Sequence, residues 1–111
     1  IGRASEGLGG LLRGSDIAAY HARLEKAWLV TYRGWEVYKV GFWSQGPVML
    51  QTLNLLEGFD LKSLGHNSAE YLHLMVEAKK LAYADMLRYV ADPRFSTVPV
   101  LPMLPSDPER P

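Results

Sequence analysis

The chain has 111 residues, 48% of them hydrophobic, with 12 Lys and Arg balanced by 12 Asp and Glu. This balance provides no long-range field for a polyanion, so it argues against nucleic acid as a partner, and no apolar run approaches the roughly 20 residues of a membrane span. The sequence contains no cysteine, which excludes disulfides, thiol nucleophiles and thiolate metal sites within it.

The N-terminal residues predict a loop followed by a short helix. The first residue is Ile1 rather than Met, which is consistent with a processed product or an internal segment. Residues 1–14 contain five glycines and are expected to be a Gly-rich loop, because so permissive a backbone is costly to order. Ser15 is the expected N-cap of a helix over residues 16–20, with Asp16 at the positive end of its dipole.

A β-hairpin is expected next. Side chains alternate with a period of two over residues 28–32, and a second β-rich run covers residues 35–40. Gly34 can supply the positive φ of a tight connection between them. An isolated hairpin is marginal in water, so we expect this one to pack on helices or to join a larger sheet.

Two helices follow the hairpin. Pro47 suits the first turn of an apolar helix that continues to Glu57, with Gly58 as the C-terminal stop, and this helix is expected to be sandwiched between other elements. Asn67 and Glu70 resemble a capping box at the start of a longer amphipathic helix over residues 68–90. The chain is therefore predicted to be α+β, a hairpin with helices.

The C-terminal residues 99–111 carry proline at every third position, at Pro99, Pro102, Pro105, Pro108 and Pro111. This interval is that of polyproline II, and no packed structure is expected there. Residues 105–110 also fit a Pro-x-x-Pro-x-Arg ligand of SH3 domains, which keeps open a non-enzymatic interaction module with a proline-rich tail. The predicted organisation is thus loop 1–14, folded segment 15–98 and tail 99–111.

Few side chains suggest a metal or a cofactor. Glu70 and His73 have the spacing of helical di-iron ligands, but such sites need a second copy and two more carboxylates. A capping Glu and a solvated His are the preferred interpretation, and His21 and His66 have no ligand at suitable spacing. We expect neither metal nor cofactor.

Two pairs of residues are structural candidates. Ser44 lies in a strand-to-helix turn but lacks the first Gly of Gly-x-Ser-x-Gly, so Ser44 and Gly46 are interpreted as a loop leading into the Pro47 helix. Asp85 falls on the apolar side of the long helix, where a carboxylate needs a partner. Arg88, three residues on, could supply a structural ion pair, which is preferred to a catalytic carboxylate.

Several sequence blocks, in this order, resemble the γ-glutamyltransferase (γ-glutamyltranspeptidase) family. They are GGLL at 9–12, DIAAY at 16–20, YRGWEV at 32–37, SQG at 44–46, LNLLEGFD at 53–60, HNSAEY at 66–71, EAKKLAYAD at 77–85 and DP at 92–93. The resemblance covers residues 9–100, which correspond to the later part of the large subunit in that family.

The resemblance implies an N-terminal-nucleophile hydrolase with an αββα sandwich, of which this chain is a fragment. The parent is a precursor that cuts itself into a large and a small subunit, and it transfers or hydrolyses γ-glutamyl groups, as in glutathione metabolism. The nucleophile is the Thr at the start of the small subunit, in a Thr-Thr-His-like context. Thr31, Thr52 and Thr97 lack that context, so no catalytic or substrate-binding residue is assigned here. The fragment alone is expected to be inactive, with the remainder of the parent as its partner; the family is often periplasmic or secreted in bacteria.

The sequence departs from the family pattern in three places. Residues 41–43 read Gly-Phe-Trp where many members have prolines, Met86 replaces a common Arg, and the tail beyond Val100 no longer resembles the family. The altered loop favours, as the alternative, a related acylase or amidohydrolase of the same superfamily.

Overall fold

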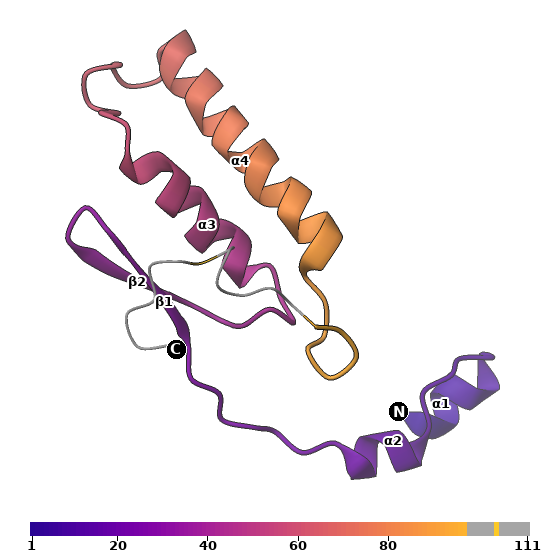
Figure 1. The fold of residues 1–111 in the computed structure, drawn as a ribbon. Helices are drawn as coiled ribbons and strands as arrows, with labels where there is room; N and C mark the ends of the chain where they lie inside the picture. The colour runs from indigo at the N-terminus through magenta and orange to yellow at the C-terminus, as the bar shows by residue number, and fades with distance from the viewer. Residues whose placement is uncertain (98–103, 105–111) are drawn as a thin grey trace.

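A computed structural model describes residues 1–97 and 104. In chain order the elements are α1 (Gly2–Gly7), α2 (Gly14–Ala19), β1 (Trp28–Tyr32), β2 (Trp35–Lys39), α3 (Gly46–Glu57) and α4 (Ala69–Tyr89). Helix α3 lies between the β1–β2 hairpin and α4, whereas α1 and α2 stand apart at the end of an extended segment (Figure 1). The radius of gyration is 18.7 Å, against about 13 Å for a compact domain of this length. The chain therefore does not close into one globule.

The hairpin is confirmed. Strands β1 and β2 are antiparallel, with Val30 opposite Val37 and Tyr32 opposite Trp35. The two turn residues, Arg33 and Gly34, have φ values of 51° and 81°. Positive φ at both positions is the geometry that matches the right-handed twist of paired strands. A non-glycine residue is uncommon in that region, so Arg33 needs contacts that hold it there.

Those contacts come from the end of α3. The Arg33 N–H lies 3.2 Å from each carboxylate oxygen of Glu57. The Arg33 guanidinium donates to the Phe59 carbonyl oxygen at 2.7 Å. The hairpin turn is thereby tied to the C-terminal end of α3, where the guanidinium is also favoured by the helix dipole.

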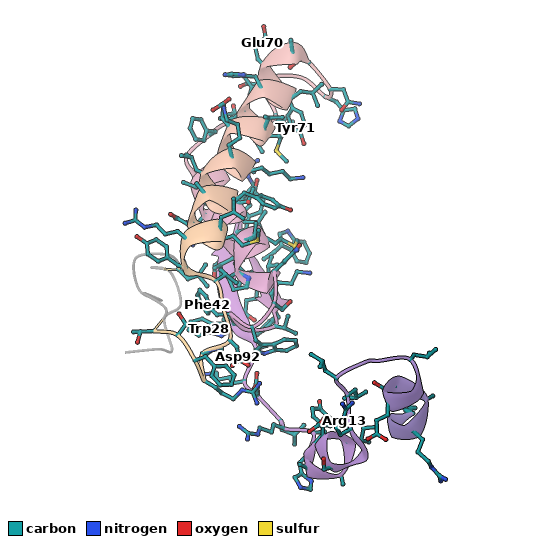
Figure 2. All side chains as sticks on the ribbon, turned by 90° about the vertical axis from the view of Figure 1, so that its right-hand side faces the viewer. Arg13, Trp28, Phe42, Glu70, Tyr71 and Asp92 are labelled. Carbon is teal, nitrogen blue, oxygen red and sulfur yellow. The ribbon has the colours of Figure 1, made fainter. Side chains whose placement is uncertain are left out.

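One face of the hairpin packs against α3 to form the core. Val30 and Leu50 are fully buried, and the rings of Trp28 and Phe42 meet edge to face with centroids 5.0 Å apart. Figure 2 shows these two rings together, far from Arg13 beside the N-terminal helices. Leu104 belongs to the same buried cluster, so the expectation that nothing in the tail packs is wrong at this residue. The proline-periodic positions themselves lie outside the described residues.

Helices α3 and α4 form an antiparallel pair (Figure 1). The predicted sandwiching of α3 is confirmed, since most of its residues are buried. Ala78 and Ala82 are the buried residues of α4, and their small side chains allow the two helices to approach closely. The expected Asn67–Glu70 capping box is wrong: Asn67 has φ of 57°, and the N-cap is Ser68, whose hydroxyl accepts from the Tyr71 N–H at 3.0 Å.

The N-terminal residues are more ordered than predicted. The sequence favoured a loop over residues 1–14, but α1 occupies part of it, and the Gly10 N–H closes the end of that helix on the Ser5 carbonyl at 2.7 Å. The N-cap of α2 is Arg13 rather than Ser15, because the Asp16 carboxylate accepts from the Arg13 N–H at 2.8 Å. Neither helix has a buried residue, so local hydrogen bonds outweigh the low helix propensity of glycine here.

Among residues 1–97 and 104, no helix is long and apolar enough to cross a membrane.

Gly46 offers a direct test of the α3–hairpin junction. A Cβ at this position would lie 2.2 Å from the Val40 carbonyl oxygen. Gly46→Ala therefore pushes the start of α3 away from the end of the hairpin and should lower the free energy of unfolding by about 1–3 kcal/mol. Urea unfolding followed by tryptophan fluorescence measures the change.

Gly58→Ala is the matched control, because Gly58 has φ of −75° and a Cβ there meets no atom within 4 Å. It should leave the stability unchanged or raise it by up to about 1 kcal/mol. Equal stabilities of the two variants would contradict the importance of the Gly46 contact.

Candidate functional site

The loop that joins β2 to α3 holds two of the structural candidates. The Ser44 N–H donates to the Gly41 carbonyl at 3.1 Å, which closes a turn. Phe42 is buried against the core, and Gly46 begins α3 beneath the Val40 carbonyl. Ser44 thus lies where the sequence predicted, in the loop leading into the Pro47 helix, whereas Gly46 is already the first residue of α3.

Ser44 lacks the surroundings of a nucleophile. A serine needs a base within about 2.6–3.2 Å of its hydroxyl, and within residues 1–97 and 104 no hydrogen bond joins Ser44 Oγ to a histidine or a carboxylate. His66 lies in the segment that connects α3 to α4, at the end of the helix pair opposite this loop (Figure 1). Its ring stands 6.4 Å from that of Tyr71, centroid to centroid.

Asp85 has a different partner from the one predicted. Its Oδ2 accepts a short hydrogen bond from Nε2 of Gln51 on α3. Arg88, the expected partner, places its guanidinium 5.1 Å from the centroid of the Tyr89 ring, and in the described part of the chain it forms no ion pair with Asp85. The predicted i to i+3 ion pair is therefore wrong, because Asp85 points across to α3 rather than along its own helix.

Gln51 was missed by the sequence reasoning, although a signal existed. Gln51 and Thr52 are buried polar residues in an otherwise apolar helix, and a buried polar side chain generally has a hydrogen-bond partner. The Thr52 hydroxyl donates to the Val48 carbonyl within α3, at 2.7 Å. Gln51 instead donates to the Asp85 carboxylate on the facing helix α4.

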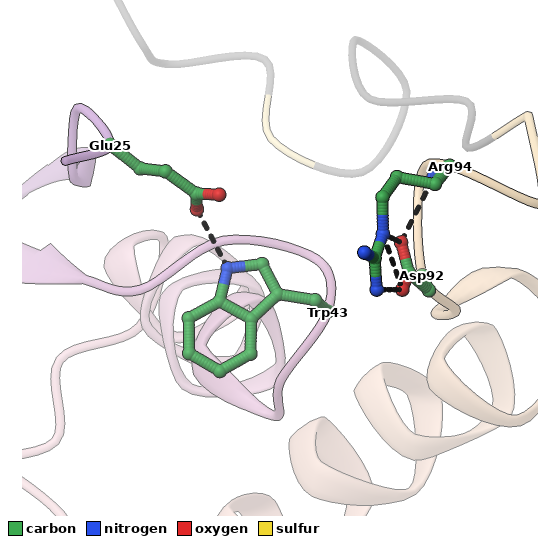
Figure 3. A network of polar contacts seen from close by, with 4 residues as sticks. All are labelled: Glu25, Trp43, Asp92 and Arg94. Carbon is green, nitrogen blue, oxygen red and sulfur yellow. Dashed lines mark hydrogen bonds and ion pairs between the residues drawn. The ribbon is translucent and has the colours of Figure 1, made fainter. Parts of the chain in front are cut away.

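A polar network brings three distant segments together (Figure 3). The Trp43 indole N–H donates to Glu25 Oε2 at 2.8 Å, so the loop before α3 is bonded to the segment before β1. Nearby, Asp92 accepts from the backbone and the guanidinium of Arg94, after the end of α4. Hydrogen bonds from Arg94 lower the pKa of Asp92 to about 2. The Asp92 carboxylate, with a smaller effect from Glu25, raises the pKa of Arg94.

The other side chains considered as metal ligands or catalytic groups do not form a site in the described residues. Residues 1–97 and 104 contain no group of three or more His, Asp or Glu side chains that could hold a metal ion. Glu70 and His73 are both exposed. The Thr52 hydroxyl is committed to its own helix, and Thr31 lies on the exposed side of β1. These side chains are not arranged as a catalytic site.

An apolar groove of about 360 Å³ lies between α3 and α4. It is lined by Gln45, Val48, Met49, Thr52, Leu53 and Leu56 from the α3 side and by Met75, Lys79 and Tyr83 from α4. Its lining has a single charged group, Lys79, and contains no carboxylate or histidine, so it is suited to apolar contact rather than to acid–base chemistry.

Asp85→Ala tests the bond between α3 and α4. The substitution leaves the buried Gln51 amide without its acceptor, and it should lower the free energy of unfolding by about 1–3 kcal/mol in urea unfolding experiments. Arg88→Ala is the control on the same helix and should change stability by less than about 0.5 kcal/mol. A larger loss of stability for Arg88→Ala than for Asp85→Ala would contradict the Gln51–Asp85 assignment and favour the predicted Asp85–Arg88 pair.

Asp92 should titrate abnormally. Its pKa of about 2 lies below the ordinary value of 3.8, so its contribution to stability is present above pH 3.8 and is lost as the pH falls through about 2. An NMR titration of the Asp92 carboxyl carbon measures this value. Arg94→Gln should return the pKa toward 3.8, and an unchanged value in that variant would contradict the assigned cause.

The sequence matches the family model described as Gamma-glutamyltranspeptidase over residues 1–108. It is 44% identical over 92 residues to the glutathione hydrolase proenzyme of Escherichia coli K12, covering 82% of this chain and 16% of that protein. It is 42% identical over 95 residues to the acylase ACY 1 proenzyme of Pseudomonas sp. SE83, covering 83% of this chain and 17% of that protein. The chain therefore spans only a small part of the length of these relatives.

Solved structures agree with the sequence matches. The gamma-glutamyltranspeptidase of Helicobacter pylori superposes with a TM-score of 0.85 at 31% identity, covering 93% of this chain and 30% of that one. The enzyme of Pseudomonas nitroreducens, complexed with L-DON, gives a TM-score of 0.84 at 30% identity, with 93% and 32% coverage. The hairpin and helices described above match a portion of these N-terminal-nucleophile hydrolase folds. The chain belongs to the gamma-glutamyltranspeptidase family.

Proposed function

We propose that this chain is a scaffold segment of a longer enzyme that transfers or hydrolyses γ-glutamyl groups through an acyl-enzyme. One observation carries the proposal: 93% of the chain superposes on the Helicobacter pylori enzyme but accounts for only 30% of that chain. Most of the machinery of such an enzyme must then lie in polypeptide outside residues 1–111.

The chemistry of acyl transfer supports this division. The reaction needs a nucleophile, a base and oxyanion donors assembled in one site. In the described residues, Thr52 is bonded within α3 and Ser44 has no base within reach. The relatives carry names of proenzymes, which supports a parent that is cut into subunits. The new N-terminal Thr of a small subunit would then supply both the nucleophile and, through its amine, the base.

The structural candidates fit a supporting role in that parent. Gly46 permits the close approach of α3 to the hairpin, and Asp85 joins α4 to α3 through Gln51. Ser44 contributes to the turn that precedes α3, and Arg88 packs on Tyr89 at the end of α4. Gly46 and Asp85 would therefore act by holding the helices on the hairpin, and Ser44 and Arg88 by local contacts, rather than by touching substrate.

The parent and the segment should behave differently in an activity assay. The full-length parent should be cut autocatalytically and then release p-nitroaniline from γ-glutamyl-p-nitroanilide. The purified 111-residue chain should give no release above background, because it lacks the nucleophile. Turnover by the chain alone, or a parent that is neither cut nor active, would falsify the proposal.

A second candidate is an acylase that acts on a different acyl group. The identity to the acylase ACY 1 proenzyme, 42%, is close to the 44% identity to the glutathione hydrolase. The loop at residues 41–43 also carries Trp43 bonded to Glu25 in place of the prolines common in γ-glutamyltransferases.

Substrate profiling of the parent separates these two activities. On the γ-glutamyl proposal, kcat/KM for γ-glutamyl-p-nitroanilide should exceed that for matched N-acyl anilides lacking the α-amino and α-carboxylate groups by at least about 100-fold, since those groups would lose charge-assisted hydrogen bonds. A preference for the simple N-acyl substrates would identify an acylase instead.

A further inference from the structure

Helix α4 carries a second apolar surface besides the one that faces α3. Leu72, Val76, Tyr83 and Leu87 are separated by four, seven and four residues, which places them on one side of the helix. Their side chains are 49%, 53%, 42% and 83% exposed. We call these four residues the α4 stripe. A helix in a monomeric domain normally buries one such face, so a second one indicates a further contact.

The stripe continues into the apolar groove between α3 and α4. Tyr83 belongs to both, and Met49, on the α3 wall of the groove, is 45% exposed. Met75 of α4 also lines the groove. The flexible methionine side chains can adapt to an apolar partner. The stripe and the groove together form one continuous surface along α4.

One cation stands at the middle of this surface. Lys79 lines the groove between Val76 and Tyr83. Its neighbour Lys80 bonds to Glu77 at 2.7 Å, whereas Lys79 forms no ion pair within residues 1–97 and 104. A partner that covers the surface would desolvate Lys79 in part, so it should bring a carboxylate to this point.

We infer that an α-helix of the parent, from outside residues 1–111, covers the α4 stripe and the groove and places an Asp or Glu opposite Lys79. The inference rests on the proposed function in requiring a longer parent. The matched chains supply enough polypeptide, because this segment covers only 30% and 32% of them. The stripe extends over 16 residues, about 22 Å, which a helix of about four turns can cover while satisfying its own backbone groups.

A second copy of the chain fits the surface less well. Two-fold pairing of identical helices brings the centre of the stripe, which falls between Val76 and Tyr83, against itself. Lys79 of each copy would then face Lys79 of the other, and such a juxtaposition of like charges disfavours the pair. An occupant of different sequence, with an acidic residue at this point, avoids the repulsion.

Cysteine labelling of the purified full-length parent tests whether the surface is covered. Val76→Cys lies in the stripe, and Ala84→Cys is a matched control on the exposed polar side of the same helix. Each thiol is labelled with a maleimide, and the modified peptide is quantified by mass spectrometry. We expect Cys at position 76 to react at least about 10-fold more slowly than Cys at position 84. Equal rates would overturn the inference.

Zero-length cross-linking identifies the occupant. A carbodiimide activates a carboxylate, and a lysine amine in contact with it displaces the activated oxygen to form an amide, with the carbodiimide leaving as a urea. Lys80 should couple to Glu77, which is an internal positive control. Lys79 should couple to an Asp or Glu peptide from outside residues 1–111, and Lys79→Ala should remove this product.

Mixing ¹⁵N-labelled and unlabelled parent before coupling separates contacts within one parent from contacts between copies. A Lys79 product with both peptides of one isotope supports the inference, whereas mixed-isotope products overturn it in favour of a second copy. Absence of any Lys79 product beside a normal Lys80–Glu77 product also overturns it.

The γ-glutamyl assay on the same preparation keeps this inference distinct from the proposed function. A parent that is active but labels freely at position 76 rejects the covering helix alone. A parent that is protected at position 76 and yields the Lys79 product, but lacks γ-glutamyl turnover, rejects the proposed activity while it supports the covering helix.

Discussion

The fold depends on the contact between α3 and the hairpin, which is secured at both ends of the helix. At its start, Gly46 passes so close beneath the Val40 carbonyl that no side chain fits between them. At its end, the Glu57 carboxylate accepts from the Arg33 N–H of the hairpin turn. Between these points Val30 of β1 and Leu50 of α3 are both fully buried in the interface between hairpin and helix. Because both ends are tied, α3 has little freedom to slide or rotate on the two strands, and α4 then packs on a fixed support.

Apart from this contact, the hairpin and the N-terminal helices of the described residues lack the packing of an independent domain. Two strands form one sheet, order β1–β2, within the described residues, and two-stranded sheets are marginal without further packing. Trp35, the first residue of β2, is 76% exposed. Helices α1 and α2 contain no buried residue. The exposed apolar groups are therefore consistent with a segment whose stability depends on polypeptide beyond it.

The sequence was most informative where one local rule decides the structure. A period of two over residues 28–32 and a second β-rich run after Gly34 predicted the hairpin, and Pro47 predicted the start of α3. It failed where the outcome depends on backbone conformation or on distant residues. Asn67 adopts a positive φ, whereas an N-cap requires extended backbone, which Ser68 has with ψ of 162°. Asp85 bonds to Gln51, 34 residues away, and spacing within one helix could suggest only Arg88. The Glu25–Trp43 bond likewise joins segments that no periodicity relates.

The Gln51–Asp85 hydrogen bond also determines which side of α4 faces away from α3. Val76 precedes Asp85 by nine residues, or two and a half helical turns, so the two side chains lie on opposite sides of the helix. With Asp85 bonded to α3, Val76 therefore points away from α3, while Tyr83 of the same stripe lines the groove between the two helices. A rotation of α4 by one residue, about 100°, would separate the polar pair and leave the Gln51 amide buried without an acceptor, which costs about 1–3 kcal/mol. A small buried polar contact thus orients an apolar surface on the opposite side of the same helix.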